Sequence, residues 1–202
     1  MSTVSLQPSA SDSLSGDAAW ASAYARGLPY DEFLDRFATE PQRNNWNEAL
    51  EAITLTAEQT ALLESFPREM HVLVLAGAWC GDCVSQCPIF EAFARVCPKL
   101  KIRYVDRNAE PPIAALMTTC GAARVPSVAF LSEDGHLCGR YGDKTLAKYR
   151  DLASQLAGDV CSTGFGEPAA MRAAVIAEWL GQFERIEWML RLSGRLRSLH
   201  GD

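Results

Sequence analysis

The chain has 202 residues, of which 48% are hydrophobic and 22% charged, and its formal net charge is −6 at pH 7. This length allows one well-buried domain with extensions or two small ones, and the composition is that of an ordinary globular protein. The acidic balance lacks the positive surface that binding to nucleic acid or to anionic lipid requires. We therefore expect neither nucleic acid nor membrane among the main partners.

The first segment, residues 1–16, is rich in serine and poor in large apolar side chains, which predicts a disordered tail. It lacks the basic and apolar regions of a secretory signal, and no run reaches the roughly 18 apolar residues of a membrane helix. These patterns predict a cytoplasmic protein, in which thiols are kept reduced. The seven cysteines are an odd number, which fits a fully paired disulfide framework poorly.

Residues 17–66 have apolar side chains at helical spacing, as between Tyr30 and Phe37. Thr56 is followed three residues later by Gln59, a pattern typical of a capped helix start. We predict an N-terminal helical extension over this segment, which ends before Pro67.

Residues 67–157 alternate between strand and helix patterns. The predicted strands are 71–76, 101–106, 127–131 and 137–141, and the predicted helices are 82–96, 111–120 and 144–156. The first strand, HVLVLA, is apolar throughout, as in strands buried on both faces. A Glu-Asp-Gly turn at 133–135 predicts a hairpin between the last two strands. The order β-α-β-α-β-β-α predicts an α/β fold with a central mixed sheet and helices on both faces.

The last segment, residues 158–202, contains a Gly-rich loop at 158–166 and then a long amphipathic helix that begins at Pro168. One face of this helix is apolar, with Ile176, Trp179, Leu180, Phe183, Ile186 and Leu190. We expect this face to pack against the N-terminal helices or the sheet, and the alternative is a homodimer or partner interface. Residues 17–202 are thus expected to form a single globular domain.

The sequence AWCGDCVSQCP, residues 78–88, places three cysteines within eight residues. Cys80 lies between a buried strand and a helix, and the helix N-terminus favours a thiolate, so we expect a lowered pKa. Cys83, one turn further, is within reach of a disulfide with Cys80, in which one thiol attacks and the other resolves. Cys87 is expected to be a packed core residue, and the alternative is a third redox thiol.

A metal site is the competing use of these cysteines. Structural zinc usually needs a second pair of ligands, but the histidines, His71, His136 and His200, are scattered along the chain. An iron–sulfur cluster would need one more cysteine of the bacterial ferredoxin pattern, unless two chains shared it. We predict no metal.

These residues resemble those of thioredoxins. WCGDC after a buried strand is similar to the thioredoxin motif WCGPC, and Pro88 matches the proline that kinks the active-site helix. Residues 125–127, Val-Pro-Ser, match the loop with the cis-proline, and Gly142 matches a glycine of the substrate groove. The resemblance covers about residues 69–157 and implies a thioredoxin-like fold. With additional helices at both ends, the chain looks similar to extended bacterial members of the thioredoxin superfamily.

By this resemblance the chain is a thiol–disulfide oxidoreductase with Cys80 as nucleophile and Cys83 as resolving thiol. The resemblance also assigns residues that border the substrate groove: Trp79, Gly81, Asp82, Arg124, Val125, Pro126 and Gly142. It implies a disulfide-bearing protein as substrate and a thioredoxin-reductase-like donor or a small thiol as reductant. No cofactor is implied.

Two positions depart from the thioredoxin pattern. Thioredoxins carry a buried acid six residues before the first cysteine, where this chain has Val74, so water or another acid such as Asp82 or Asp106 must accept the proton. Asp82 replaces the proline between the cysteines, and its carboxylate either disfavours a nearby thiolate or, as we expect, caps the helix. The second candidate function is therefore a thioredoxin-fold scaffold, partner-binding or redox-sensing module with little turnover.

Overall fold

The structure is a computed structural model that describes residues 16–157 and 168–202. The predicted tail, apart from Gly16, and the Gly-rich loop at 158–166 lie outside the described residues. Helices precede the first strand, as the sequence predicts: α1 (Asp17–Arg26), α2 (Tyr30–Phe37), α3 (Glu40–Glu51) and α4 (Ala57–Glu64). The predicted cap at Thr56 is confirmed, because its hydroxyl accepts from the backbone N–H of Gln59, whose side chain accepts from the N–H of Thr56.

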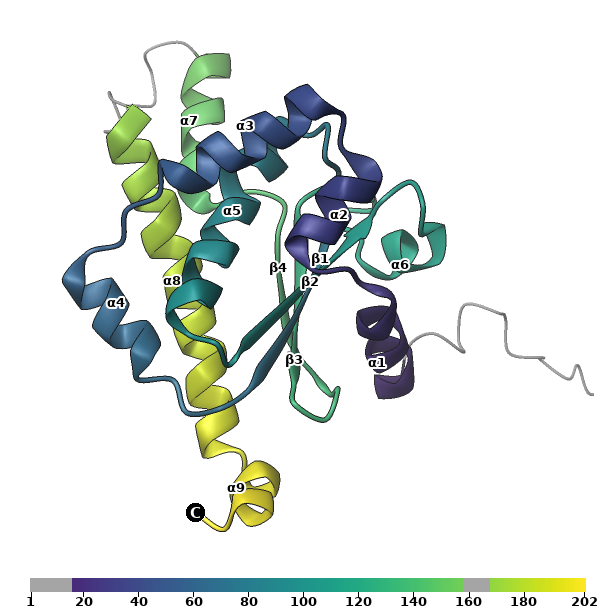
Figure 1. The fold of residues 1–202 in the computed structure, drawn as a ribbon, viewed down its shortest axis with the longest axis vertical. Coiled ribbons are helices and arrows are strands. Elements are labelled where there is room, and N and C mark those ends of the chain that lie inside the picture. Colours follow the sequence, from purple (N-terminus) through teal and green to yellow (C-terminus); the bar gives the residue numbers. More distant parts are fainter. Residues whose placement is uncertain (1–15, 158–167) are drawn as a thin grey trace, which may run out of the picture.

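A mixed sheet forms the centre of the molecule. Its strands are β1 (Met70–Ala76), β2 (Leu100–Asp106), β3 (Ser127–Ser132) and β4 (Leu137–Gly142), in the order β2-β1-β3-β4. β1 pairs parallel with β2, whereas β3 runs antiparallel to both β1 and β4. Helices lie on both sides of the sheet, and the predicted thioredoxin-like fold is confirmed (Figure 1).

Two predicted helices end earlier than expected. The remaining helices are α5 (Gly81–Val96), α6 (Pro111–Leu116), α7 (Leu146–Ala157), α8 (Pro168–Leu192) and α9 (Gly194–His200). The helix predicted to reach Cys120 stops at Leu116, and Cys120 itself has a φ of 50°, which a right-handed helix does not allow. The long C-terminal helix is interrupted at Ser193, whose hydroxyl accepts from the N–H of Leu196 and caps α9.

The apolar face of α8 is covered by the rest of the chain. All six residues predicted to form it are buried. Trp179 packs against Phe90 of α5 with ring centroids 4.6 Å apart, and Phe183 packs against Phe130 of β3 at 5.2 Å. The expectation that this face packs against the N-terminal helices or the sheet is thus confirmed for the sheet. Figure 1 shows α8 running beside α5.

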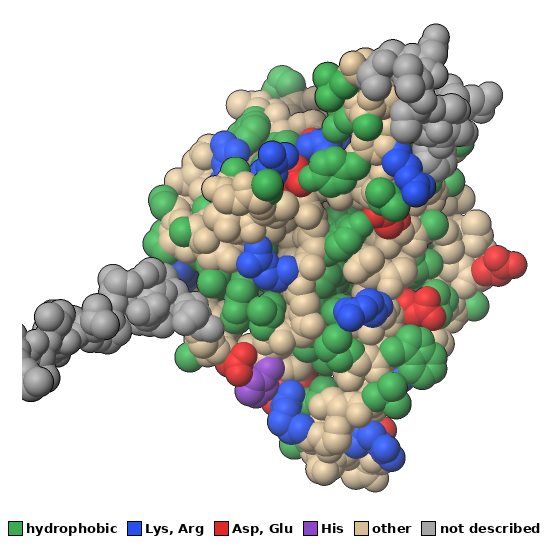
Figure 2. Space-filling model, turned by 180° about the vertical axis from the view of Figure 1, so that it is seen from behind, with side chains coloured by type: hydrophobic (Ala, Val, Ile, Leu, Met, Phe, Trp, Pro, Cys, Tyr) green, Lys and Arg blue, Asp and Glu red, His purple; other side chains and the backbone are tan. Residues whose placement is uncertain are grey.

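The other side of α8 is open to solvent, with Trp188, Met189 and Leu192 exposed. Figure 2, the view from behind, shows hydrophobic and charged side chains interspersed over the C-terminal end of the molecule. A homodimer through the C-terminal helix, the alternative raised by the sequence, stays a prediction.

The N-terminal extension reaches the loop that precedes the cysteines. Trp46 of α3 is fully buried and contacts Tyr30, Phe33 and Tyr104 in an aromatic cluster. Its indole Nε1 donates to the carbonyl of Ala78 at 3.0 Å. The extension therefore fixes the backbone two residues before Cys80.

Candidate active site

Cys80 and Cys83 lie together at the start of α5. Cys80 is the N-cap residue of the helix and is partly exposed, whereas Cys83 is fully buried in the first turn. Cys80 and Cys83 are separated by one helical turn, and the Cys80 Sγ lies 3.7 Å from the carbonyl oxygen of Val125. The Val125–Pro126 peptide bond is cis, as predicted. The fold thus brings the exposed thiol, the sheltered thiol and the proline loop to one place.

The protonation of the pair differs from the expectation. The neighbouring Cys83 thiol, together with burial, raises the pKa of Cys80, and burial raises the pKa of Cys83. The predicted lowering of the Cys80 pKa is therefore wrong for the reduced pair, because loss of water and the neighbouring thiol outweigh the helix N-terminus. Both thiols hold their protons at neutral pH in this state.

Cys87 is fully buried, as expected for a packed residue. After burial, the neighbouring Cys87 thiol also contributes to the raised pKa of Cys83. The remaining cysteines of the described residues are Cys97, Cys120 and Cys138, while Cys161 lies outside them. A redox role for Cys87 stays a prediction.

The residues predicted to border the substrate groove surround Cys80. Trp79 is 48% exposed, and the guanidinium of Arg107 lies 4.6 Å from its ring centroid. Gly81 begins α5, and Val125 is buried beside Pro126. Gly142 has a φ of +127°, and a Cβ there would lie 2.5 Å from the Pro126 carbonyl oxygen, so only glycine fits.

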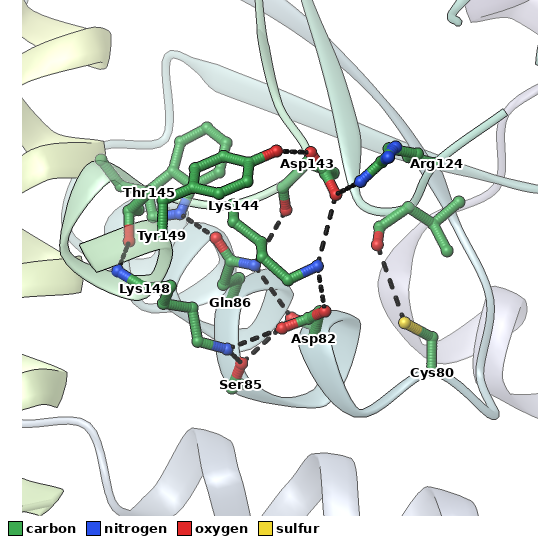
Figure 3. Close-up of polar contacts among 12 residues, drawn as sticks. Cys80, Asp82, Ser85, Gln86, Arg124, Asp143, Lys144, Thr145, Lys148 and Tyr149 are labelled. Atoms are coloured by element: carbon green, nitrogen blue, oxygen red, sulfur yellow. Dashed lines mark hydrogen bonds and ion pairs between the residues drawn. The ribbon is translucent and has the colours of Figure 1, made fainter. Parts of the chain in front are cut away.

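Asp82 does not cap the helix, which corrects the expectation from sequence. Cys80 occupies the N-cap position, and the Asp82 carboxylate instead pairs with Lys144 at 2.8 Å and Lys148 at 2.9 Å (Figure 3). Burial raises the pKa of Asp82, but the hydrogen bonds from the two lysines outweigh it, and the net pKa is lowered. The residue between the cysteines is thus a carboxylate whose charge is compensated.

Asp143 was missed from the sequence; it lies directly after Gly142 and is almost fully buried. Its carboxylate lies 3.4 Å from Arg124 and 3.3 Å from Lys144, and it accepts from the hydroxyl of Tyr149. Lys144 therefore bridges Asp82 and Asp143, as Figure 3 shows. Arg124, predicted to border the groove, is held by this network while its side chain stays 46% exposed.

Gln86 of α5 connects three segments and was also missed from the sequence. Its side chain is fully buried, and its Nε2 donates to the carbonyls of Asp82 at 3.2 Å and Asp143 at 3.1 Å. Its Oε1 accepts from the indole Nε1 of Trp179 at 3.0 Å. The side-chain amide of Gln86 thus connects three parts of the chain: the active-site helix α5, the loop between β4 and α7, and α8.

The position of the missing acid, Val74, is buried between Tyr104 of β2 and Val128 of β3. Of the two replacements that the sequence offered, Asp82 has a lowered pKa, which makes it a poor proton acceptor. Asp106 accepts from the backbone N–H groups of Asn108 and Ala109 and holds the turn after β2. Neither carboxylate is hydrogen-bonded to the Cys83 thiol; both are engaged with other partners.

Within residues 16–157 and 168–202, no three His, Cys, Asp or Glu side chains are grouped so that they could hold a metal ion. Over the same ranges, none of the helices is both long and apolar enough to cross a membrane.

Two solved structures share this fold with TM-scores of 0.60. A protein of unknown function from Pseudomonas aeruginosa is 19% identical over 81% of this chain and 98% of its own, with a TM-score of 0.60. An HIV epitope scaffold is 20% identical over 80% and 98%, also with a TM-score of 0.60. A thioredoxin from Fasciola hepatica is 24% identical over 49% and 91%, with a TM-score of 0.33.

Among curated proteins, none matches the chain. The family model that matches is described as thioredoxin, and it covers residues 27–152, which is more than half of the chain. This range contains the sheet, the Cys80–Cys83 pair, the cis-proline loop and three of the N-terminal helices. The chain therefore belongs to the thioredoxin family.

Proposed function

We propose that the protein is a thiol–disulfide oxidoreductase that reduces or exchanges disulfides of protein substrates through Cys80 and Cys83. The observation that carries the proposal is the placement of a partly exposed thiol, Cys80, at a helix N-terminus beside the Val125 carbonyl, with the buried thiol of Cys83 one turn further along the same helix. This arrangement gives one sulfur access to a substrate and shelters the other until the first exchange has occurred. Membership of the thioredoxin family supports the same chemistry.

In the proposed cycle, Cys80 first loses its proton to water, and the resulting thiolate attacks one sulfur of the substrate disulfide. A mixed disulfide forms, and the other substrate sulfur leaves as a thiolate that takes up a proton. Cys83 then loses its proton and attacks the Cys80 sulfur, which releases the second substrate thiolate and leaves a Cys80–Cys83 disulfide. Two electrons have passed to the substrate, and a thioredoxin-reductase-like protein or a small thiol returns them.

The proton of Cys83 leaves through water or to the departing substrate thiolate, because Val74 offers no acid and Asp82 is held by two lysines. A cytoplasmic location is part of the proposal, since a reducing compartment keeps such a pair in its dithiol form.

A second candidate is a thioredoxin-fold scaffold or redox-sensing module with little turnover. The raised pKa values of both cysteines favour it, because they leave little thiolate at neutral pH. The helices that extend the fold on both sides would then serve to hold a partner.

Reduction of insulin by dithiothreitol separates the two candidates. If the protein is an oxidoreductase, it accelerates the reduction of insulin, and Cys80→Ser abolishes this acceleration. The control variant Cys87→Ser, which changes a buried thiol, retains it. A scaffold leaves the reduction at its uncatalysed rate and retains a bound partner when both Cys80 and Cys83 are serine. If the wild type accelerated insulin reduction and the Cys80→Ser variant did so equally well, the assignment of Cys80 as nucleophile would be contradicted.

A further inference from the structure

A cavity of about 330 Å³ lies beside the active-site helix α5. Side chains of α3, α5 and α8 and the residue just beyond α3 make its apolar wall: Ala49, Ile53, Val84, Ile89, Met171 and Val175. A volume of this size with a mostly apolar lining and a few polar groups is typical of small-molecule sites, which span roughly 300–1,000 Å³.

The polar groups of this cavity are mainly cationic. Arg172 of α8 lines it and donates to the carbonyl of Ala52 at 3.1 Å, which places the guanidinium at the end of α3. Lys148 of α7 also lines it, and its Nζ donates to Ser85 Oγ at 2.6 Å and to the Asp82 carboxylate at 2.9 Å. The cavity therefore combines an apolar wall with two positive side chains.

A smaller hollow of about 260 Å³ adjoins the cavity and shares Lys148 and Met171 with it. It adds Lys144 and two carboxylates, Asp82 and Asp151. Lys148 and Lys144 pair with Asp82, and Lys144 also pairs with Asp143, whereas Arg172 makes no ion pair among the described residues. An anionic group is therefore favoured over a cationic one.

We propose that this cavity binds a small amphipathic anion, such as a medium-chain carboxylate. The hydrocarbon tail lies against Ile53, Ile89 and Val175, and the carboxylate accepts hydrogen bonds from Arg172 and Lys148. Burial of the tail supplies the affinity, and the two cations select an anionic head group. Lys148 also donates to Asp82, the residue between Cys80 and Cys83. The bound anion would therefore contact a lysine that is itself paired with a residue of the redox motif.

The full chain labelled at isoleucine δ1 methyl groups allows a direct test, with sodium decanoate as the probe. The sequence has six isoleucines, and Ile53 and Ile89 line the cavity whereas Ile102 and Ile113 do not. We expect saturable chemical-shift changes at Ile53 and Ile89 and none at Ile102 and Ile113. Ile53→Val and Ile89→Val assign the two signals.

Two arginines of α8 provide a matched pair of variants. Arg172→Gln should weaken decanoate binding by about tenfold or more, the effect of losing one charged hydrogen bond. Arg185→Gln, at an exposed position of the same helix, should leave it unchanged. Decanol, which has the tail without the charge, should bind about tenfold more weakly than decanoate. Shifts spread over all six methyl groups, no saturation, or equal weakening by both variants would overturn the proposal.

Discussion

The carboxylate of Asp82 lies 2.8 Å from the ammonium group of Lys144. The residue between the two redox cysteines therefore forms an ion pair with the loop that precedes α7. Lys148 adds a second contact at 2.9 Å. In the thioredoxin motif that this chain resembles, the same position holds a proline, which carries no charge. Here an added negative charge is matched by cations from a segment more than 60 residues away in the sequence.

Removal of both lysines should slow the reaction of Cys80. In Lys144→Met with Lys148→Met, Asp82 becomes an uncompensated negative charge that disfavours a thiolate nearby. We expect the pKa of Cys80 to rise by about one unit and its alkylation at pH 7 to slow about tenfold. Addition of Asp82→Asn to this double variant should restore the wild-type rate. Alkylation kinetics followed by mass spectrometry measure the effect, and a double variant as fast as the wild type would contradict it.

The effect of the neighbouring Cys83 thiol should be visible in the pH profile of Cys80. The raised pKa predicts a small thiolate fraction at neutral pH, so the alkylation rate should keep increasing above pH 9. Cys83→Ala removes the partner thiol and should move the inflection to lower pH, which makes Cys80 faster at pH 7. Cys87→Ala, one turn beyond Cys83, should leave the profile in place. An inflection below pH 7 in the wild type is the result that this interpretation does not allow.

The buried amide of Gln86 should contribute strongly to stability. Gln86→Leu leaves the indole N–H of Trp179 and two backbone carbonyls without their partner. We expect the free energy of unfolding to fall by about 2–4 kcal/mol, because each unsatisfied buried group costs about 1–3 kcal/mol. Trp179→Phe removes one of these bonds and should cost less. A double-mutant cycle in urea unfolding measures the coupling, and additive losses would show that the pair does not interact.

Glu91 should make the stability of the fold fall as the pH rises. Burial raises the pKa of Glu91 to about 7 from its usual 4.5, despite the hydrogen bond from Tyr104. The folded chain therefore holds a proton that the unfolded chain has lost, and this stabilisation is full below about pH 4.5 and lost by about pH 7. Glu91→Gln keeps a neutral acceptor for Tyr104. The stability of this variant relative to the wild type should increase between pH 5 and 8, by up to about 3 kcal/mol; a constant difference in unfolding free energy across this range would refute the assignment.

The strands and most of the helices could be predicted because their signals are local. A run such as HVLVLA shows burial on both faces, and the Thr56 cap shows a helix start. The end of α6 could not be predicted, because nothing in the composition of residues 117–120 forbids a helix, and Cys120 leaves the helical conformation in its tertiary context.

The candidate site divides in the same way. Cys80, Cys83, Pro126 and Gly142 were found because a motif and its spacing identify them. The network of Asp143, Lys144, Lys148 and Gln86 was missed, because contacts between α5 and residues about 60 positions later leave no periodic pattern. The helix-capping role expected for Asp82 was wrong for the same reason, since its partners lie outside any local window.

Trp46 donates to the backbone carbonyl of Ala78, just before Cys80, and Trp179 donates to the side-chain amide of Gln86. Both tryptophans lie outside residues 67–157. A fragment trimmed to the length of a minimal thioredoxin would therefore lose two indole donors, one from each flank. The carbonyl of Ala78 and the Oε1 of Gln86 would then turn to solvent within a few residues of the cysteines. Such a fragment would carry the same motif in altered surroundings, so any redox property measured on it would describe the fragment and not the parent protein.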